Sequence, residues 1–198
     1  MKHYSDVKAE RSGSGREMLP AGGYVCQIIS AKVDSNEWGE TLVVAHDVCE
    51  GDYEGIFKRD YENNDREDKK WRGTFRLKLP KDDGSEKDGW TKKSFAGWTN
   101  AFEESNQGYS WDWDEKKWKG KLVGIVFGDT GTVIEGKEIV YTEPRFAVPA
   151  AAVRSGLAPA AKFKAKNGYT GNGSNSSASS SDGFMNIPDG VIDELPFN

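Results

Sequence analysis

Short apolar runs separated by turn residues most constrain the fold of this 198-residue chain. Runs rich in valine, isoleucine and aromatic residues predict strands at 24–33, 41–49, 71–79 and 120–128, with shorter ones at 132–134, 137–141 and 145–148. Residues 50–55 predict a hairpin turn into an extended run at 56–59, and 129–131 predict another turn. Residues 90–106 have the one convincing helical period, with Phe95, Trp98 and Phe102 on one apolar stripe that we expect in the core, and a short helix is expected at 150–154. Because no strand–helix–strand rhythm appears, we expect a mainly β fold: a small closed antiparallel barrel with one principal helix, which follows the third strand.

The composition changes towards the C-terminus, where glycine, serine and asparagine replace the apolar runs. Such a stretch cannot bury enough apolar surface to fold, and it is typical of flexible tethers. About 155 residues are then left for one domain, a length that supports a real hydrophobic core. The expected parts are a flexible N-terminal arm at 1–18, a folded domain at 19–154, a flexible linker at 155–181 and a disordered acidic tip at 182–198.

The acidic net charge of −5 does not exclude nucleic acid as a partner. Residues 167–198 contain four acidic and no basic residues, and removing these four from the 32 acidic residues leaves 28, against 27 Lys and Arg. A nearly neutral domain can bind DNA through a local basic patch. Aromatic side chains make up 12% of the chain, and they serve both as core residues and as stacking surfaces for unpaired bases.

The expected strand at 71–79 separates charge from apolar surface. Its odd-numbered positions are apolar or glycine, whereas its even-numbered positions are Arg, Thr, Arg and Lys. A face with only cationic charges suits a phosphate backbone, and the alternative is an ordinary solvated face. The residues predicted to bind nucleic acid are Arg72, Arg76 and Lys78 of this strand, Lys58, Arg59, Tyr61, Lys69 and Lys70 of the preceding segment, and the aromatic Trp71, Phe75, Trp111 and Trp113. Trp111 and Trp113 alternate with charges, so local packing under a hairpin is the alternative for these two residues.

The last residues, 183–198, combine three carboxylates with apolar side chains and contain no basic residue. On a polar tether, such a peptide suits a basic pocket with an apolar floor on another protein. The alternative is a chain end without a partner. The residues predicted to bind a partner protein are Asp189, Asp193, Glu194, Leu195, Pro196 and Phe197.

Both ends of the chain resemble known proteins, and the middle does so only loosely. The ending Asp193-Glu-Leu-Pro-Phe197 is similar to the acidic tip of bacterial single-stranded-DNA-binding proteins. Segments 1–10 and 19–26 resemble replication-module proteins of phages that infect Gram-positive bacteria, several of which share the tip and are described as single-strand-binding proteins of the OB-fold kind. The chain departs from the bacterial pattern at its end, where Asn198 follows Phe197.

The resemblance implies both a fold and a role. The fold would be an OB fold at 19–154, a small antiparallel barrel. The role would be to bind and protect single-stranded DNA, with little sequence preference, during phage DNA replication and recombination. The tip would recruit replication, recombination or repair proteins, and the protein would work in the cytoplasm of the bacterial host.

No residue pattern predicts an enzyme, a cofactor or a metal site. Cys26 and Cys49 are single and far apart, and the chain has only two histidines, so a zinc ligand set is lacking. Both cysteines are expected as buried reduced thiols, and His46 is expected in the core or on a sheet face. The sequence shows neither a signal peptide nor an apolar run long enough to span a membrane.

Two other functions remain open. Asp129, Glu135 and Lys137 match the carboxylates and lysine of a metal-dependent nuclease, although a polar hairpin tip explains the same residues. A protein-interaction adaptor would use the barrel and the tip without DNA. Self-association into a homo-oligomer is compatible with each function and is not specified by the residues.

Overall fold

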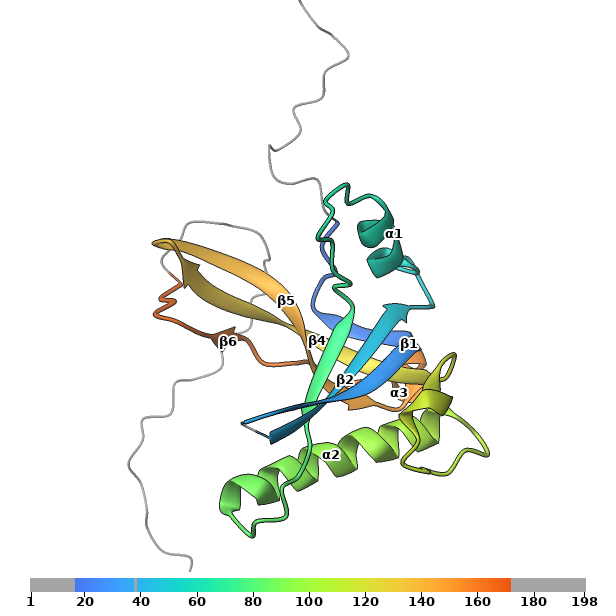
Figure 1. Cartoon of the computed structure of the whole chain (residues 1–198). Helices are drawn as coiled ribbons and strands as arrows, with labels where there is room; N and C mark the ends of the chain where they lie inside the picture. The colour runs from blue at the N-terminus through green and yellow to red at the C-terminus, as the bar shows by residue number, and fades with distance from the viewer. Residues whose placement is uncertain (1–16, 38, 172–198) are drawn as a thin grey trace, which may run out of the picture.

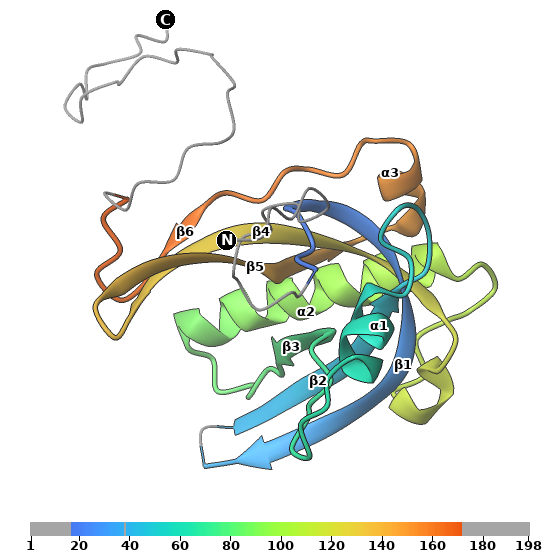
Figure 2. The same ribbon diagram turned by 90° about the horizontal axis from the view of Figure 1, so that it is seen from above.

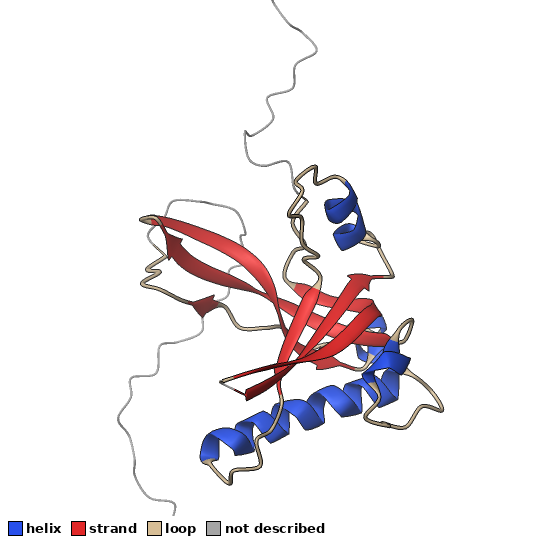
Figure 3. Ribbon diagram, in the orientation of Figure 1, coloured by secondary structure: helices blue, strands red, loops and turns tan. Residues whose placement is uncertain are grey.

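The computed structural model describes residues 17–37 and 39–171, and the fold is mainly β, with a six-stranded mixed sheet at its centre (Figures 1 and 3). The strands are β1 (Gly22–Asn36), β2 (Gly39–Val48), β3 (Thr74–Lys78), β4 (Leu122–Ile134), β5 (Lys137–Val148) and β6 (Lys164–Ala165). The helices are α1 (Ile56–Glu62), α2 (Glu86–Ser105), α3 (Ala150–Arg154) and a short 3-10 helix, η1 (Glu115–Trp118).

The sheet is curled but not closed. Its hydrogen-bonded path runs β3-β2-β1-β4-β5 with every neighbouring pair antiparallel, and β6 joins β4 in parallel. The path ends at β3 and β5 with no ladder between them, so the predicted closure is not observed; we call this place the open seam. Helix α2 packs against β3, β4 and β5 (Figure 2). β3 has only five residues, and Trp98 of α2 stacks on Phe75 of β3 at 4.9 Å, so a helix side chain fills space beside the seam.

Two predicted local structures are wrong, because contacts with residues elsewhere in the chain decide the conformation of these segments. The run at 56–59 belongs to helix α1, whose first N–H groups at Phe57 and Lys58 donate to the Asp47 carboxylate of β2, each at 3.0 Å. A side chain ten residues earlier thus caps this helix, a partner that local sequence does not reveal. The expected turn at 129–131 is continuous strand, because this part of β4 pairs with both β5 and β6.

Other expectations are confirmed. The turn between β4 and β5 consists of Glu135 and Gly136, both with positive φ (50° and 75°), which is the type I′ geometry of two-residue hairpins. Helix α3 forms at Ala150–Arg154. Trp98 and Phe102 of the predicted apolar stripe are buried, at 2% and 0% exposure.

The core lies between the curled sheet and α2 and has apolar side chains from β1, β2, β3 and β4. His46 is fully buried within it, and burial lowers the pKa of His46 to about 4. Cys26 is a buried free thiol, as expected, whereas Cys49 is a free thiol that is only half-buried. Burial also raises the pKa of Cys49 to about 11.

The chain after α3 returns to the sheet. Residues 155–171, the first part of the predicted linker, run back along β4, where Lys164–Ala165 form β6. The Tyr169 ring covers Gly131, since a Cβ at that glycine would lie 2.6 Å from the ring. The Lys166 ammonium contacts the Glu143 carboxylate of β5 at 2.9 Å. The rest of the predicted linker and the tip lie outside the described residues.

Candidate nucleic-acid interface

The two faces of β3 differ as the sequence predicts. Phe75 and Leu77 are buried, at 5% and 8% exposure, whereas Arg76 and Lys78 are exposed on the outer face of the sheet. Arg76 lies opposite Val43 of β2, and Lys78 lies opposite Thr41. Neither cation has a salt-bridge partner in the described part of the chain. This short edge strand therefore presents two uncompensated positive charges to solvent.

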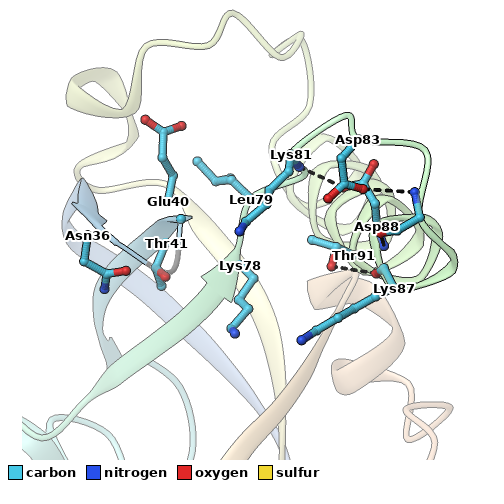
Figure 4. A pocket seen from close by; sticks show the side chains of 12 residues that line it. Asn36, Glu40, Thr41, Lys78, Leu79, Lys81, Asp83, Lys87, Asp88 and Thr91 are labelled. Atoms are coloured by element: carbon cyan, nitrogen blue, oxygen red, sulfur yellow. Dashed lines mark hydrogen bonds between the residues drawn. The ribbon is translucent and has the colours of Figure 1, made fainter.

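A cavity of about 360 Å³ continues this face between the β1–β2 hairpin, the end of β3 and the start of α2 (Figure 4). Three lysines line it: Lys78, Lys81 and Lys87. The Lys78 and Lys87 side chains extend from β3 and from α2 toward the same side of the cavity, away from the Glu40 carboxylate. Lys81 reaches the hairpin, where a Cβ at Gly39 would lie 2.7 Å from its Cε.

The acidic residues at the start of α2 serve the fold of this segment. The buried Asp88 carboxylate accepts the Lys81 backbone N–H at 2.7 Å and faces the Lys92 ammonium at 3.2 Å. Burial opposes ionisation of Asp88, yet these two donors hold the pKa of its carboxyl below the usual value. Asp83 accepts the Ser85 N–H at 2.9 Å, just before the helix. Lys78, Lys81 and Lys87 have no salt-bridge partner among the described residues, so their ammonium groups can meet a ligand, although Glu40, Asp83 and Asp88 also line the cavity.

Arg72 does not continue the row formed by Arg76 and Lys78. Its guanidinium pairs with the Asp60 carboxylate of α1 at 3.2 Å, and it lines a different depression beside β5. Just before it, the Trp71 indole N–H donates to the carbonyl oxygens of His46 and Gly73, each at 3.0 Å. The backbone that joins α1 to β3 is therefore held against β2, and Arg72 is turned toward α1.

The predicted residues of the 58–70 segment form a group of their own around α1. The Tyr61 ring contacts the Trp71 ring at 5.8 Å, and the Lys69 ammonium lies 4.8 Å from the Tyr61 ring centre. Arg59 pairs with Glu17 at 3.0 Å, and Lys58 lies 4.0 Å from the Glu62 carboxylate. Lys70 is exposed. Two of these four cations, Lys58 and Arg59, have a carboxylate partner, so this group is a weaker anion site than the β3 face.

The two tryptophans after α2 have different surroundings. Trp111 is half-buried against Trp118 at 4.5 Å, which makes it part of the aromatic core. Trp113 is 74% exposed and stacks on Phe95 at 5.7 Å. Together with Pro80, which comes two residues after the end of β3, these rings line a shallow cavity. The structure therefore brings an exposed indole to the end of the cationic strand.

The charges interleaved with these tryptophans hold their loop. The Asp112 carboxylate accepts the Tyr109 hydroxyl at 2.6 Å and pairs with Lys117 at 3.0 Å, and these two contacts lower the pKa of Asp112 to about 2. It also accepts the Asp114 N–H at 3.2 Å. Trp113 has a φ of 58°, a left-handed conformation that is rare outside glycine. Asp112 contacts residues on both sides of Trp113, and these contacts fix the backbone at Trp113 and leave its indole exposed to solvent.

Phe75 was also predicted to bind nucleic acid, but its side chain does not lie on the outer face of β3. Its ring faces the interior, because it shares the apolar face of β3 with Leu77. The predicted partner-binding residues at 189 and 193–197 lie outside the described part of the chain.

The carboxylates of the nuclease alternative do not meet. Asp129 lies within β4, where its carboxylate accepts the Thr142 hydroxyl at 3.2 Å, and Glu135 lies at the hairpin tip. Six residues of extended strand separate them by about 20 Å, too far for one metal ion. Within residues 17–37 and 39–171, no group of three or more His, Cys, Asp or Glu side chains could hold a metal ion.

Lys81 and Lys87 are the site residues that the sequence did not single out. Both lie in the polar stretch between β3 and the apolar stripe of α2, where any lysine suggests a solvated loop. A usable signal was Ser85 with the acidic residues at 86 and 88, a helix-start pattern that moves the start of α2 upstream and places Lys87 in its first turn.

No protein-family model and no curated protein sequence matches this chain. In the segments that the structure describes, no helix has the length and apolar character needed to cross a membrane.

Proposed function

We propose that this protein binds single-stranded DNA, with little sequence preference, along the outer face of β3 and the adjoining lysine cavity. One observation carries the proposal: in a chain with a net charge of −5, Arg76, Lys78, Lys81 and Lys87 gather on one surface without a salt-bridge partner in the described residues. Phosphates are the ligands that such a surface attracts. The exposed Trp113 beyond Pro80 would add a stacking surface, which an unpaired strand can use and a duplex cannot.

The strand order supports an OB-like fold in this proposal. An OB fold is a five-stranded, partly open barrel that binds oligonucleotides on the face of its second and third strands and with the loop between its first and second strands. The path β3-β2-β1-β4-β5, with α2 between β3 and β4, is compatible with that plan. The cationic face of β3 and the cavity beside the β1–β2 hairpin are the corresponding places here.

The biological setting is proposed from the sequence resemblance alone. A phage single-strand-binding protein would protect DNA during replication and recombination in the host cytoplasm. Its acidic tip, through Asp193, Glu194 and Leu195–Phe197, would recruit replication or repair proteins.

The test is a titration of fluorescein-labelled oligo-dT at two salt concentrations, beside a duplex of equal length. We expect tight binding of the single strand, weakened by salt, and much weaker binding of the duplex. Absence of binding at low salt would refute the proposal and favour the adaptor, for which the tip would be the functional element. Magnesium-dependent degradation of the oligonucleotide would favour a nuclease instead.

A further inference from the structure

A second cavity, of about 360 Å³, lies at the open seam. Its walls come from Phe75 and Leu77 of β3, from one face of α2 and from residues 145–147 of β5. Figure 1 shows α2 running beneath these two strands. β3 separates this seam cavity from the cationic outer face, because alternate residues of the strand point to the two sides. The volume is within the range of small-ligand sites.

The charges on the wall of the seam cavity are all positive. Lys93 and Arg145 line it, and no acidic residue does. Each of the other three cavities described above has at least one carboxylate in its wall. Arg145 pairs with Glu143 at 2.8 Å, but that one carboxylate also faces Lys166 at 2.9 Å and Lys164 at 3.9 Å. The Arg145 guanidinium also donates to the Asp129 carbonyl at 2.7 Å and to the Thr130 hydroxyl at 2.6 Å, so its charge is turned toward β4, and Lys93 is the cation that this cavity offers to a ligand.

Two buried donors in residues of this wall lack an acceptor. The Trp98 indole N–H belongs to a side chain that is only 2% exposed, and it has no hydrogen-bond partner among the described residues. The Arg145 Nε–H is also buried and without a partner among the described residues, but it lies over β4, where a Cβ at Gly128 would be 3.0 Å from this nitrogen, so the Trp98 indole is the donor that concerns the cavity. An unsatisfied buried donor is unfavourable, and it favours a ligand rich in acceptor oxygens and nitrogens.

The remaining walls are flat and aromatic. Phe75 and Trp98 stack with an interplanar angle of 28°, and Trp90 is 65% exposed with the Lys93 ammonium 5.2 Å from its ring centre. Aromatic rings beside a cation suit a ligand with a planar ring and a phosphate.

Gly97 keeps the helix wall of the cavity open. It lies in the interior of α2, where glycine destabilises a helix by about 1 kcal/mol relative to alanine. Packing does not require this glycine, because a Cβ there would meet no heavy atom within 4 Å. Any larger side chain at this position would project into open space at the cavity.

We propose that the seam cavity binds one unstacked nucleotide of a bound single strand, with the base against the aromatic wall and the phosphate near Lys93. The proposal rests on the proposed function, since it adds a site for one nucleotide to the track on the outer face. The strand would pass around the free edge of β3, which has no neighbouring strand at the seam.

The experiment follows the tryptophan indole N–H signals of the ¹⁵N-labelled full chain by NMR, with Trp90→Phe and Trp98→Phe used for assignment. The probes are oligo-dT, deoxythymidine monophosphate and a peptide of residues 183–198. We expect oligo-dT and the mononucleotide to shift the Trp90 and Trp98 signals. Gly97→Leu should remove these shifts and weaken oligo-dT binding about tenfold, the scale of one lost stacking contact. The matched control is Gly89→Leu, in the same helix, where a Cβ also meets open space outside the cavity wall.

The outcomes separate the two proposals. If oligo-dT binds without shifting these two signals, or binds Gly97→Leu as tightly as Gly89→Leu, the cavity proposal is wrong and the proposed function stands. If oligo-dT does not bind at all, the proposed function fails, and shifts with the mononucleotide alone decide whether the cavity is a nucleotide site. Shifts with the acidic peptide and none with either nucleotide probe would assign the cavity to peptide carboxylates and overturn the proposal.

Discussion

Removing the two exposed charges of β3 should lower the salt dependence of DNA binding by a calculable amount. Each phosphate contact with a single strand contributes about 0.7 to the slope of log K against log salt. Four uncompensated cations, Arg76, Lys78, Lys81 and Lys87, predict a slope of about −2.8, or roughly a 50-fold loss between about 50 mM and about 200 mM salt. The double variant Arg76→Gln/Lys78→Gln should have a slope of about −1.4 and lose only about sevenfold over the same range.

The matched control is Lys116→Gln/Lys119→Gln, which removes two exposed lysines in and just after η1, away from β3. Fluorescence anisotropy of labelled oligo-dT at four or more salt concentrations gives the slopes. Thermal melts should show that both variants keep the wild-type stability, because substitutions of exposed residues without partners change it little. If the β3 double variant has the same slope of log K against log salt as the control variant, the outer face of β3 is not the DNA-binding surface.

Three further predictions concern stability and reactivity. Burial lowers the pKa of His46 from 6.5 to about 4, so between these pH values the unfolded chain binds a proton that the folded chain does not. The free energy of unfolding should therefore fall by about 3 kcal/mol as the pH falls from 6.5 to 4. Urea melts of His46→Leu should lack this decrease, and a variant with the same pH dependence as the wild type would contradict the prediction. Gly131→Val should displace the Tyr169 ring, and limited digestion should then show faster trypsin cleavage after Lys164. An unchanged digestion pattern would show that the Tyr169 ring can pack on β4 without a glycine at position 131. Cys49, whose pKa burial raises to about 11, should react with a disulfide reagent at about pH 8 far more slowly than free cysteine, and rapid labelling would contradict its placement.

Local patterns in the sequence were sufficient for most of the sheet and for the polarity of β3. The two-residue period fixes which side chains share a face wherever a strand forms, so Arg76 and Lys78 could be placed opposite Phe75 and Leu77 before any tertiary contact was known. The apolar stripe of α2 could be predicted for the same reason, because helical spacing is a local property of the sequence.

The misassigned segments depended on distant partners. Helix α1 begins where the Asp47 carboxylate of another strand accepts its first N–H groups, so its run of apolar and basic residues looked extended when taken alone. Arg72 matched Arg76 in spacing, but the Asp60 carboxylate of α1 holds it on another surface.

The sequence by itself determined the mainly β class, the burial of Trp98, and the one-sign charge of the outer face of β3. These follow from periodicity and composition, which act within a few residues. Only the tertiary structure decided that the sheet stays open between β3 and β5, that Lys81 and Lys87 join Lys78 around a cavity, and that Trp113 reaches the end of β3. Each of these depends on how α2 and the curled sheet pack together, and the free energy of that packing comes from contacts between residues far apart in the chain.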